Sequence, residues 1–232
     1  MEKETENSDF NWKCYENNQF YYKKFKNVEP AINLDFFYRE IYLWDDCSPT
    51  RCCYEMFENI IKPGDVVLDL GANIGLFTRK AAQIASKVIA VEASPEHFSC
   101  LIENTSEFNN VECINALVVG DNNSGDINTV WSNKSSRMKI TIEEIMKIYN
   151  LDRIDFIKMD IEGGEYDLLN NTPVEVLNKL DKISCEMHGS FFPNEPNKDQ
   201  DFYIPNKVRN SWVWLFNNGK DSETFFYFKN FN

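Results

Sequence analysis

The sequence predicts an α/β fold with a doubly wound, mostly parallel sheet that ends in an antiparallel hairpin. Apolar runs typical of strands alternate with helix-like runs between residues 66 and 187. Beyond a Pro- and Asn-rich stretch, aromatic runs at 211–216 and 224–228 flank turn residues around Gly219, which indicates a hairpin. Because strand–helix–strand crossovers are right-handed, the helices of such a chain cover both faces of the sheet.

Each expected parallel strand is short and nearly all apolar, which is typical of strands buried on both faces. These strands are predicted at residues 66–70, 87–91, 111–119, 154–159 and 181–187. Periodic spacing predicts helices over residues 74–84 and 141–149, and from Pro95 and Tyr166 onward. Ser94 suits the N-cap before Pro95, and Thr141 with Glu144 makes a capping box.

Length and composition favour one globular domain. The chain has 232 residues, of which 43% are hydrophobic, which is enough for a packed core. We assign residues 31–232 to a single domain and residues 1–30 to a polar, partly disordered N-terminal segment. The formal net charge of −13 argues against binding to nucleic acid, which needs a basic surface.

The cysteines and the absence of long apolar runs indicate the compartment. The seven cysteines include a cluster, Cys47, Cys52 and Cys53, that lacks the paired spacing and the His partner of a zinc site. The acidic start has no signal-peptide core, and no apolar run reaches the roughly 18 residues of a membrane span. We therefore expect reduced thiols, no membrane span and a cytoplasmic location.

A glycine turn between two predicted strands is typical of a nucleotide-cofactor site. Residues 66–75 read Val-Val-Leu-Asp-Leu-Gly-Ala-Asn-Ile-Gly, and the next strand leads to Glu92. An acid about 20 residues past such a turn can accept two hydrogen bonds from a ribose diol. Only Gly71 and Gly75 stand where a dinucleotide site needs three glycines, and the Cβ of Asn73 would crowd a pyrophosphate.

S-adenosylmethionine, which carries no phosphate, fits this turn better. Its amino-acid end would contact the loop, where Asp69 can anchor the ammonium group directly or through water, and its ribose would meet Glu92. The alternative is that Gly71 and Gly75 only permit close packing of helix on strand. The acids before and after the turn favour the cofactor.

Three motifs together resemble the FkbM-type methyltransferases. They are Asp-Leu-Gly-Ala-Asn-Ile-Gly at 69–75, Val-Glu-Ala-Ser-Pro-Glu at 91–96 and Ile-Asp-Phe-Ile-Lys-Met-Asp-Ile-Glu-Gly-Gly-Glu at 154–165. The resemblance covers about residues 60–190. It implies a class I, Rossmann-like fold with a seven-stranded sheet, and an S-adenosylmethionine-dependent O-methyltransferase of sugars or natural products.

The resemblance also implies which residues bind the cofactor. The methionine end would be lined by Gly71, Ala72, Asn73 and Gly75. Glu92 would hold the ribose hydroxyls, with Ala93 and Ser94 beside the sugar or adenine. Asn115 and Ala116 match a position that usually borders the adenine, although the common Gly-Asp-Ala pattern is absent there.

The acidic run after the fourth predicted strand supplies candidate catalytic groups. Lys158 and Asp160 share one face of the strand, and Glu162 follows in the turn. Methyl transfer to a hydroxyl needs a base for the proton, or a cation that stabilises the developing alkoxide. Asp160 or Glu162 could be the base, since clustered carboxylates raise one another's pKa values. Glu165 is expected to cap its own helix.

Two histidines are interpreted differently. His188, at the end of the fifth predicted strand, is a further candidate for proton transfer, with a hydrogen-bonded turn histidine as the alternative. His97, early in a helix, is expected to be structural or solvent-facing. Asp160, Glu186 and His188 could instead hold Mg²⁺, as in some O-methyltransferases, and we place the metal-free base ahead of this site.

The sequence thus predicts an S-adenosylmethionine-dependent O-methyltransferase with a small-molecule or glycan acceptor. A nicotinamide-dependent oxidoreductase of the same fold is opposed by the missing third glycine, and a catalytically silent binding module stays open. No motif identifies the acceptor. Aromatic segments near 36–44 and 202–216 could line its pocket or belong to the core. A homodimer is compatible with the sequence.

Overall fold

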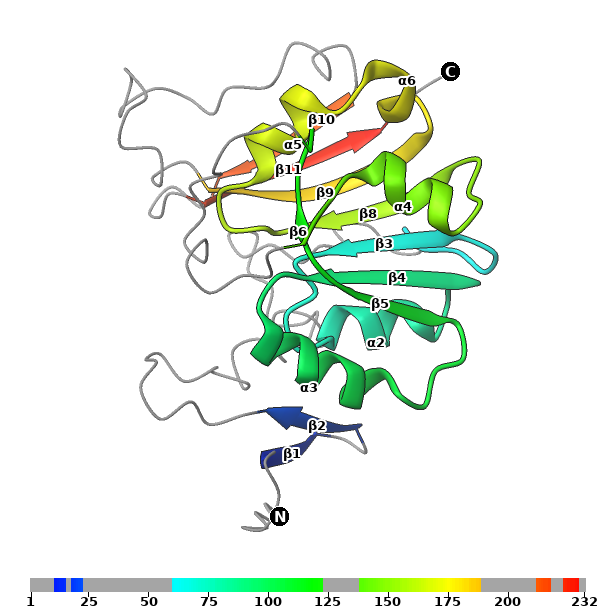
Figure 1. Cartoon of the computed structure of the whole chain (residues 1–232), viewed down its shortest axis with the longest axis vertical. Coiled ribbons are helices and arrows are strands. Elements are labelled where there is room, and N and C mark those ends of the chain that lie inside the picture. Colours follow the sequence, from blue (N-terminus) through cyan, green and yellow to red (C-terminus); the bar gives the residue numbers. More distant parts are fainter. Residues whose placement is uncertain are drawn as a thin grey trace.

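The computed structural model describes residues 60–122 and 138–188, with side chains up to residue 186. It also describes the backbone of four further strands, β1 (Asn11–Tyr15), β2 (Asn18–Tyr22), β10 (Trp212–Asn217) and β11 (Glu223–Lys229). β1 and β2 form an antiparallel hairpin, and β2 lies next to α3 (Pro95–Thr105) (Figure 1). The sequence predicted no element in this N-terminal part.

The central element is a seven-stranded sheet with the order β10-β11-β9-β8-β3-β4-β5. Its remaining strands are β3 (Val66–Leu70), β4 (Lys87–Glu92), β5 (Val111–Asn115), β8 (Ile154–Met159) and β9 (Leu180–His188). These five strands pair in parallel, whereas β11 is antiparallel to both β9 and β10. The predicted α/β fold, mostly parallel with a C-terminal antiparallel hairpin, is therefore confirmed.

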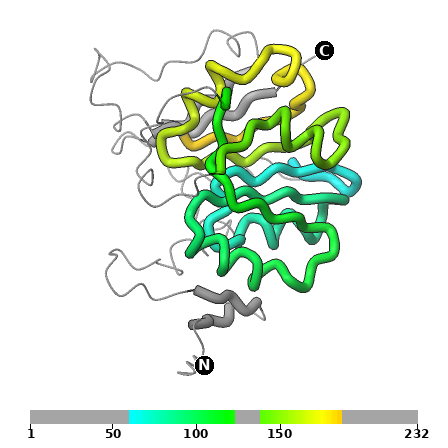
Figure 2. The backbone as a smooth tube through the Cα atoms, in the orientation of Figure 1, coloured from blue at the N-terminus to red at the C-terminus, as the bar shows by residue number. Residues whose placement is uncertain are grey.

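The strand order reverses at β3. The chain first adds β4 and β5 on one side of β3 and then returns to add β8 and β9 on the other side. Figure 2 shows this reversal as a cyan-to-green half and a yellow-green half that meet at the cyan strand. In open parallel sheets, ligands bind beside such a reversal at the carboxyl ends of the strands. The predicted motifs after β3, β4 and β8 all lie there.

Helices cover both faces of the sheet. Val67 of β3 packs in a cluster with Phe77 and Ala81 of α2 (Leu76–Ala82), whereas Leu68 and Leu70 face the other way. That second face is covered by α4 (Ile142–Ile148), α5 (Glu165–Asn171) and α6 (Val174–Leu177). Residues of β3 thus pack into the hydrophobic clusters on both faces of the sheet, as expected for a strand buried on both sides.

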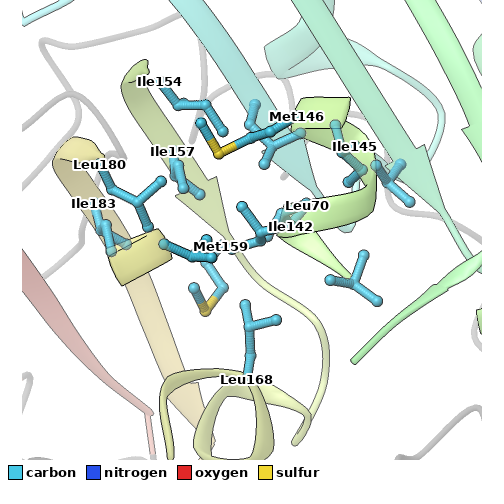
Figure 3. Close-up of a cluster of buried hydrophobic side chains, with 14 of the residues drawn as sticks. Leu70, Ile142, Ile145, Met146, Ile154, Ile157, Met159, Leu168, Leu180 and Ile183 are labelled. Carbon is cyan, nitrogen blue, oxygen red and sulfur yellow. The ribbon is translucent and has the colours of Figure 1, made fainter. Parts of the chain in front are cut away.

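The larger core cluster lies beneath α4, α5 and α6. Figure 3 labels ten of its members, which come from β3, β8, β9, α4 and α5: Leu70, Ile142, Ile145, Met146, Ile154, Ile157, Met159, Leu168, Leu180 and Ile183. Full burial of an aliphatic side chain contributes roughly 1.5–3 kcal/mol. The strands that end at the predicted motifs are therefore anchored in a densely packed core.

The third strand is shorter than predicted. Residues 111–119 were expected to form one strand, but β5 ends at Asn115. The chain then forms β6 (Leu117–Val118), which pairs in parallel with β7 (Lys139–Ile140) in a separate two-stranded sheet. β5 ends early because Leu117 and Val118 pair with β7, some 20 residues further along the chain, and not with β4. The residues next to β5 in the sequence do not reveal this distant partner.

The helix predicted over residues 74–84 is also shorter, and begins only at Leu76. Asn73 and Gly75 both have positive φ angles, 52° and 92°, which an α-helix does not accommodate. The two capping predictions are confirmed. Ser94 accepts a hydrogen bond from the N–H of His97 at the start of α3, and α4 begins with a complete capping box.

Several predictions concern residues outside the described part of the chain. They are the aromatic segment near 36–44, the cysteine cluster from Cys47 to Cys53 and most of the polar stretch 120–138. Within the described residues, Cys100, Cys113 and Cys185 form no disulfide. Within the same residues, no helix is long and apolar enough to cross a membrane. The assignment of residues 31–232 to one domain stays a prediction.

Candidate functional site

The loop after β3 is held tightly against its neighbours. The backbone N–H groups of Gly71 and Ala72 both donate to the carbonyl of Val91 in β4, each at 3.0 Å. Gly71 has a φ of 74°, and a Cβ built on it would lie 1.7 Å from the carbonyl oxygen of Asp160. Glycine is therefore required at this position by contact with the acidic turn that follows β8.

Gly75, at the end of the loop, is enclosed by α3. A Cβ on Gly75 would lie 2.8 Å from Cδ1 of Leu101. Asn104 of α3 donates from Nδ2 to the carbonyl of Ile74, at 2.7 Å, and fixes the loop from the same side. Close packing alone accounts for both Gly71 and Gly75, so the evidence for a ligand comes from the polar groups around the loop.

Two buried side-chain oxygens at this loop, Asp69 Oδ1 and Asn73 Oδ1, have no hydrogen-bond partner. Asp69 is fully buried, and its Oδ2 accepts from the Thr78 hydroxyl at 2.5 Å. Burial raises the pKa of Asp69, and the nearby ammonium of Lys158 opposes this rise. Because buried acceptors without a hydrogen bond are costly, a ligand that offers N–H or O–H donors would be stabilised here.

Lys158 lies buried between the loop and the acidic turn. Its Nζ donates to the carbonyl of Gly71 at 2.7 Å, and lies 3.6 Å from Asp69 Oδ1 and 3.7 Å from Asp160 Oδ2. Burial by itself lowers the pKa of Lys158, but Asp160, Asp69 and two further carboxylates outweigh burial, so the pKa is raised. Lys158 is therefore a fixed cation that joins the loop to the turn.

The turn after β8 presents the predicted acids at the same edge of the sheet. The N–H of Asp160 donates to the carbonyl of Leu70 at 3.1 Å, which places Asp160 beside the glycine loop. The Asp160 side chain is 23% exposed, whereas that of Lys158 is 5% exposed. Glu162 is only partly buried and has a φ of 55°, an uncommon conformation for a non-glycine residue.

Glu165 stabilises the turn rather than facing a substrate. Its carboxylate accepts from the N–H groups of Ile161, at 3.0 Å, and Gly163, at 3.0 Å and 3.2 Å. The side chain is fully buried at the start of α5. Glu165 was expected to cap its own helix, but α5 has no side-chain cap, and Glu165 instead accepts from N–H groups of the turn before the helix. Its role therefore differs from that of the more open Asp160.

Glu92, at the end of β4, braces the glycine loop. Its Oε2 accepts from the N–H of Asn73 at 2.8 Å, and its Oε1 accepts from the N–H of Ser94 at 2.7 Å. Burial raises the pKa of Glu92 to about 7, although these two N–H groups oppose the rise. Each oxygen keeps a second lone pair, so the carboxylate can still accept from a ligand diol.

His97 was not among the predicted site residues. It was expected to be structural or solvent-facing, and its side chain is 14% exposed, which agrees with the structural alternative and not with the solvent-facing one; Nδ1 lies 3.9 Å from Oε1 of Glu92. Burial lowers its pKa, and the carboxylate of Glu96 opposes this. The sequence does offer a signal, because the Ser94 N-cap places His97 in the first turn of α3, directly after β4.

The predicted adenine-side residues have different surroundings. Asn115 donates from Nδ2 to the carbonyl of Glu92 at 2.8 Å, and thereby holds the ends of β4 and β5 together. Ala116 is 1% exposed and belongs to the larger core, and Ala93 is partly exposed. Among these residues, Ala93 and Asn115 keep access to the carboxyl edge of the sheet, whereas the Ala116 side chain is enclosed by protein.

The metal alternative involves residues of β9. Glu186 is buried, and its carboxylate contributes to the raised pKa of Lys158. His188 ends β9, where its backbone pairs with Glu223, but its side chain lies outside the described ones. Among the side chains that the structure describes, no group of three or more His, Cys, Asp or Glu residues is arranged to hold a metal ion.

Comparison with known families identifies the chain. The model of the methyltransferase FkbM domain matches residues 69–219. This chain belongs to the FkbM methyltransferase family. The FkbM chain is therefore a methyltransferase, as the three motifs predicted, and a nicotinamide-dependent oxidoreductase is not supported. Family and fold together imply the use of S-adenosylmethionine.

Individual relatives of this FkbM protein are distant. Methyltransferase 1 of Beauveria bassiana (strain ARSEF 2860) is 24% identical over 210 residues, which span 72% of this chain and 80% of the relative. An rRNA methylase from Streptococcus thermophilus has a TM-score of 0.47 at 11% identity and covers 80% of this chain and 98% of its own. Trm5b from Pyrococcus abyssi has a TM-score of 0.48 at 16% identity, and the match covers 96% of this chain and 56% of Trm5b. Such likeness says nothing about the acceptor.

Proposed function

We propose that this protein is an S-adenosylmethionine-dependent O-methyltransferase that acts on a hydroxyl of a sugar, a glycan or a small natural product. The observation that carries the proposal is the direct contact between the glycine loop and the acidic turn. Gly71 has no room for a Cβ against the carbonyl of Asp160, and Lys158 lies between the two segments. A carboxylate is thereby held next to the cofactor loop, where methyl transfer to a hydroxyl needs a base.

The polar groups at the loop suit S-adenosylmethionine. Asp69 Oδ1 and Asn73 Oδ1, both without a hydrogen-bond partner, would accept from the ammonium of its amino-acid end. The free lone pairs of Glu92 would accept from the ribose hydroxyls. A pyrophosphate would instead meet the negative charges of Asp69 and Glu92. Bound there, the cofactor supplies a methyl group carried on a positively charged sulfur.

The chain itself must remove the proton of the acceptor hydroxyl. Asp160 is the first candidate, because its carboxylate is partly exposed at the carboxyl edge of the sheet and lies 3.7 Å from the Lys158 ammonium. Glu162, in the same turn, is the second candidate. Lys158 is a buried cation that already donates to Gly71, so we assign it to holding the loop rather than to proton transfer. His188 stays a candidate by its place at the end of β9.

The acceptor class follows from charge and family. A net charge of −13 disfavours the phosphate backbone of RNA, although rRNA methylases are among the structural neighbours. A neutral sugar or polyol carries no such penalty. The FkbM resemblance points to hydroxyls of sugars and natural products, and the acidic turn supplies the base that a hydroxyl acceptor requires.

The test follows transfer of a tritiated methyl group from S-adenosylmethionine to sugars, glycolipids, small polyols and ribosomal RNA. We expect base-stable ether label on a sugar or polyol. Asp160→Asn should lower the rate about 100-fold or more, since general bases contribute roughly 10²–10⁴, and should leave affinity for S-adenosylhomocysteine within about threefold. Asp152 is an exposed aspartate before β8, and Asp152→Asn is the matched control, which should change neither the rate of methyl transfer nor the affinity for S-adenosylhomocysteine. Label on RNA, or on nitrogen, would overturn the proposal.

A further inference from the structure

Glu92 and His97 form a buried pair at the end of β4. Nδ1 of His97 lies 3.9 Å from Oε1 of Glu92, and the two side chains are 14% and 10% exposed. Ser94 holds both members, because its N–H donates to Glu92 Oε1 and its Oγ accepts from the N–H of His97. The separation of the pair is therefore set by the backbone at the start of α3.

The charged and polar surroundings decide where a proton resides in this pair. Burial raises the pKa of Glu92 to about 7 and lowers the pKa of His97. The groups that act on Glu92 are the N–H groups of Ser94 and Asn73 and the charges of Lys158 and Asp69, and the charge of Glu96 acts on His97. On the acid side of neutrality the Glu92 carboxyl therefore holds a proton, and burial disfavours the charged form of His97.

A vicinal diol binds best when that proton is not on Glu92. Two hydroxyls that donate to one carboxyl group are best accepted by the ionised form, since a protonated carboxyl has an O–H of its own. The proton must then leave Glu92. His97 Nδ1 is a basic atom beside this carboxyl group, and 3.9 Å is about 1 Å longer than an ordinary N–H···O hydrogen bond.

We propose that His97 is a positioning residue of the cofactor site, which takes the proton from Glu92 when a ribose diol binds. The O–H bond of the Glu92 carboxyl breaks, an N–H bond forms at His97 Nδ1, and a carboxylate–imidazolium pair remains with no proton exchanged with solvent. The accepting imidazole carries its first proton on Nε2. This inference rests on the proposed function, because the diol is that of S-adenosylmethionine.

Without His97, the proton must go to the solvent, and this difference can be measured. With a pKa of about 7, Glu92 is about nine-tenths protonated at pH 6. Binding of a diol to a His97 variant should then release about nine-tenths of a proton at pH 6 and almost none at pH 8. Its affinity should fall about tenfold between pH 8 and pH 6.

Calorimetry of S-adenosylhomocysteine binding to the full chain, in buffers of different ionisation enthalpy, counts these protons. We expect the wild type to release less than about 0.2 proton at pH 6 and to change affinity less than about threefold between pH 6 and pH 8. His97→Gln should show the full release and the tenfold loss. Ser99→Ala, two residues further along α3, is the matched control and should behave as the wild type.

Each other outcome is decisive. His97→Asn replaces His97→Gln if the latter lacks the far-UV spectrum of the wild type, and must give the same release. Equal proton release by the wild type and both variants overturns the role of His97 and leaves the proposed function standing. Failure of the wild type to bind S-adenosylhomocysteine overturns the proposed function, and the role of His97 with it.

Discussion

Replacement of Gly71 by alanine tests the contact between the glycine loop and the acidic turn. The residue has a φ of 74°, which costs an L-residue roughly 1–2 kcal/mol. The new Cβ would also lie 1.7 Å from the Asp160 carbonyl oxygen and 2.8 Å from its carbon, both backbone atoms that cannot rotate away. Overpacking of this kind costs about 1–3 kcal/mol. We therefore expect Gly71→Ala to lower the free energy of unfolding by about 2–5 kcal/mol.

Gly64 supplies the control for backbone strain. It has a φ of 98°, but a Cβ there would meet nothing within 4 Å. Gly64→Ala should therefore cost only the strain, about 1–2 kcal/mol. Urea unfolding followed by circular dichroism measures both variants. If Gly71→Ala is no less stable than Gly64→Ala, the loop does not contact the turn, and the argument for a base beside the cofactor is refuted.

Three further outcomes are expected. Glu92→Gln should remove a pH dependence of the free energy of unfolding. With a pKa of about 7, the Glu92 carboxyl of the folded protein keeps a proton at pH values where the unfolded chain has released it. The free energy of unfolding of the wild type, measured in urea, should therefore fall relative to that of the variant by up to about 3 kcal/mol from pH 5 to pH 8. A constant difference would show that Glu92 is ionised throughout. Lys158→Met should cost about 3–5 kcal/mol, because it leaves the fully buried Asp69 and the partly exposed Asp160 without their cation, whereas Lys147→Met breaks only an exposed pair with Glu143 and should cost under about 0.5 kcal/mol. EDTA should leave methyl transfer unchanged, and loss of activity that Mg²⁺ restores would favour the metal site.

Continuous apolar runs made the central strands predictable. Residues 66–70 and 154–159 are strands with the predicted bounds, because each is buried on both faces and bounded by polar residues. The caps at Ser94 and Thr141 were predictable for a similar reason, since a cap depends on residues within one helical turn. Local sequence was sufficient wherever the deciding contact is local.

Contacts between distant segments could not be predicted from sequence. The early end of β5 depends on pairing of Leu117–Val118 with Lys139–Ile140. The need for glycine at Gly71 comes from Asp160, and Lys158 serves that same junction by donating to the loop carbonyl. The motifs identified the glycine loop and the acidic turn, which the structure brings into contact, but their spacing could not show which groups hold the loop and which remain open to a substrate.

The most direct test of the central claim is calorimetric titration of the wild-type protein with S-adenosylhomocysteine and, separately, with NAD. The buried oxygens of Asp69 and Asn73 that lack a hydrogen bond, together with Glu92, predict micromolar binding of S-adenosylhomocysteine and no binding of NAD. Binding of NAD, or of neither ligand, would contradict the assignment of this loop to S-adenosylmethionine.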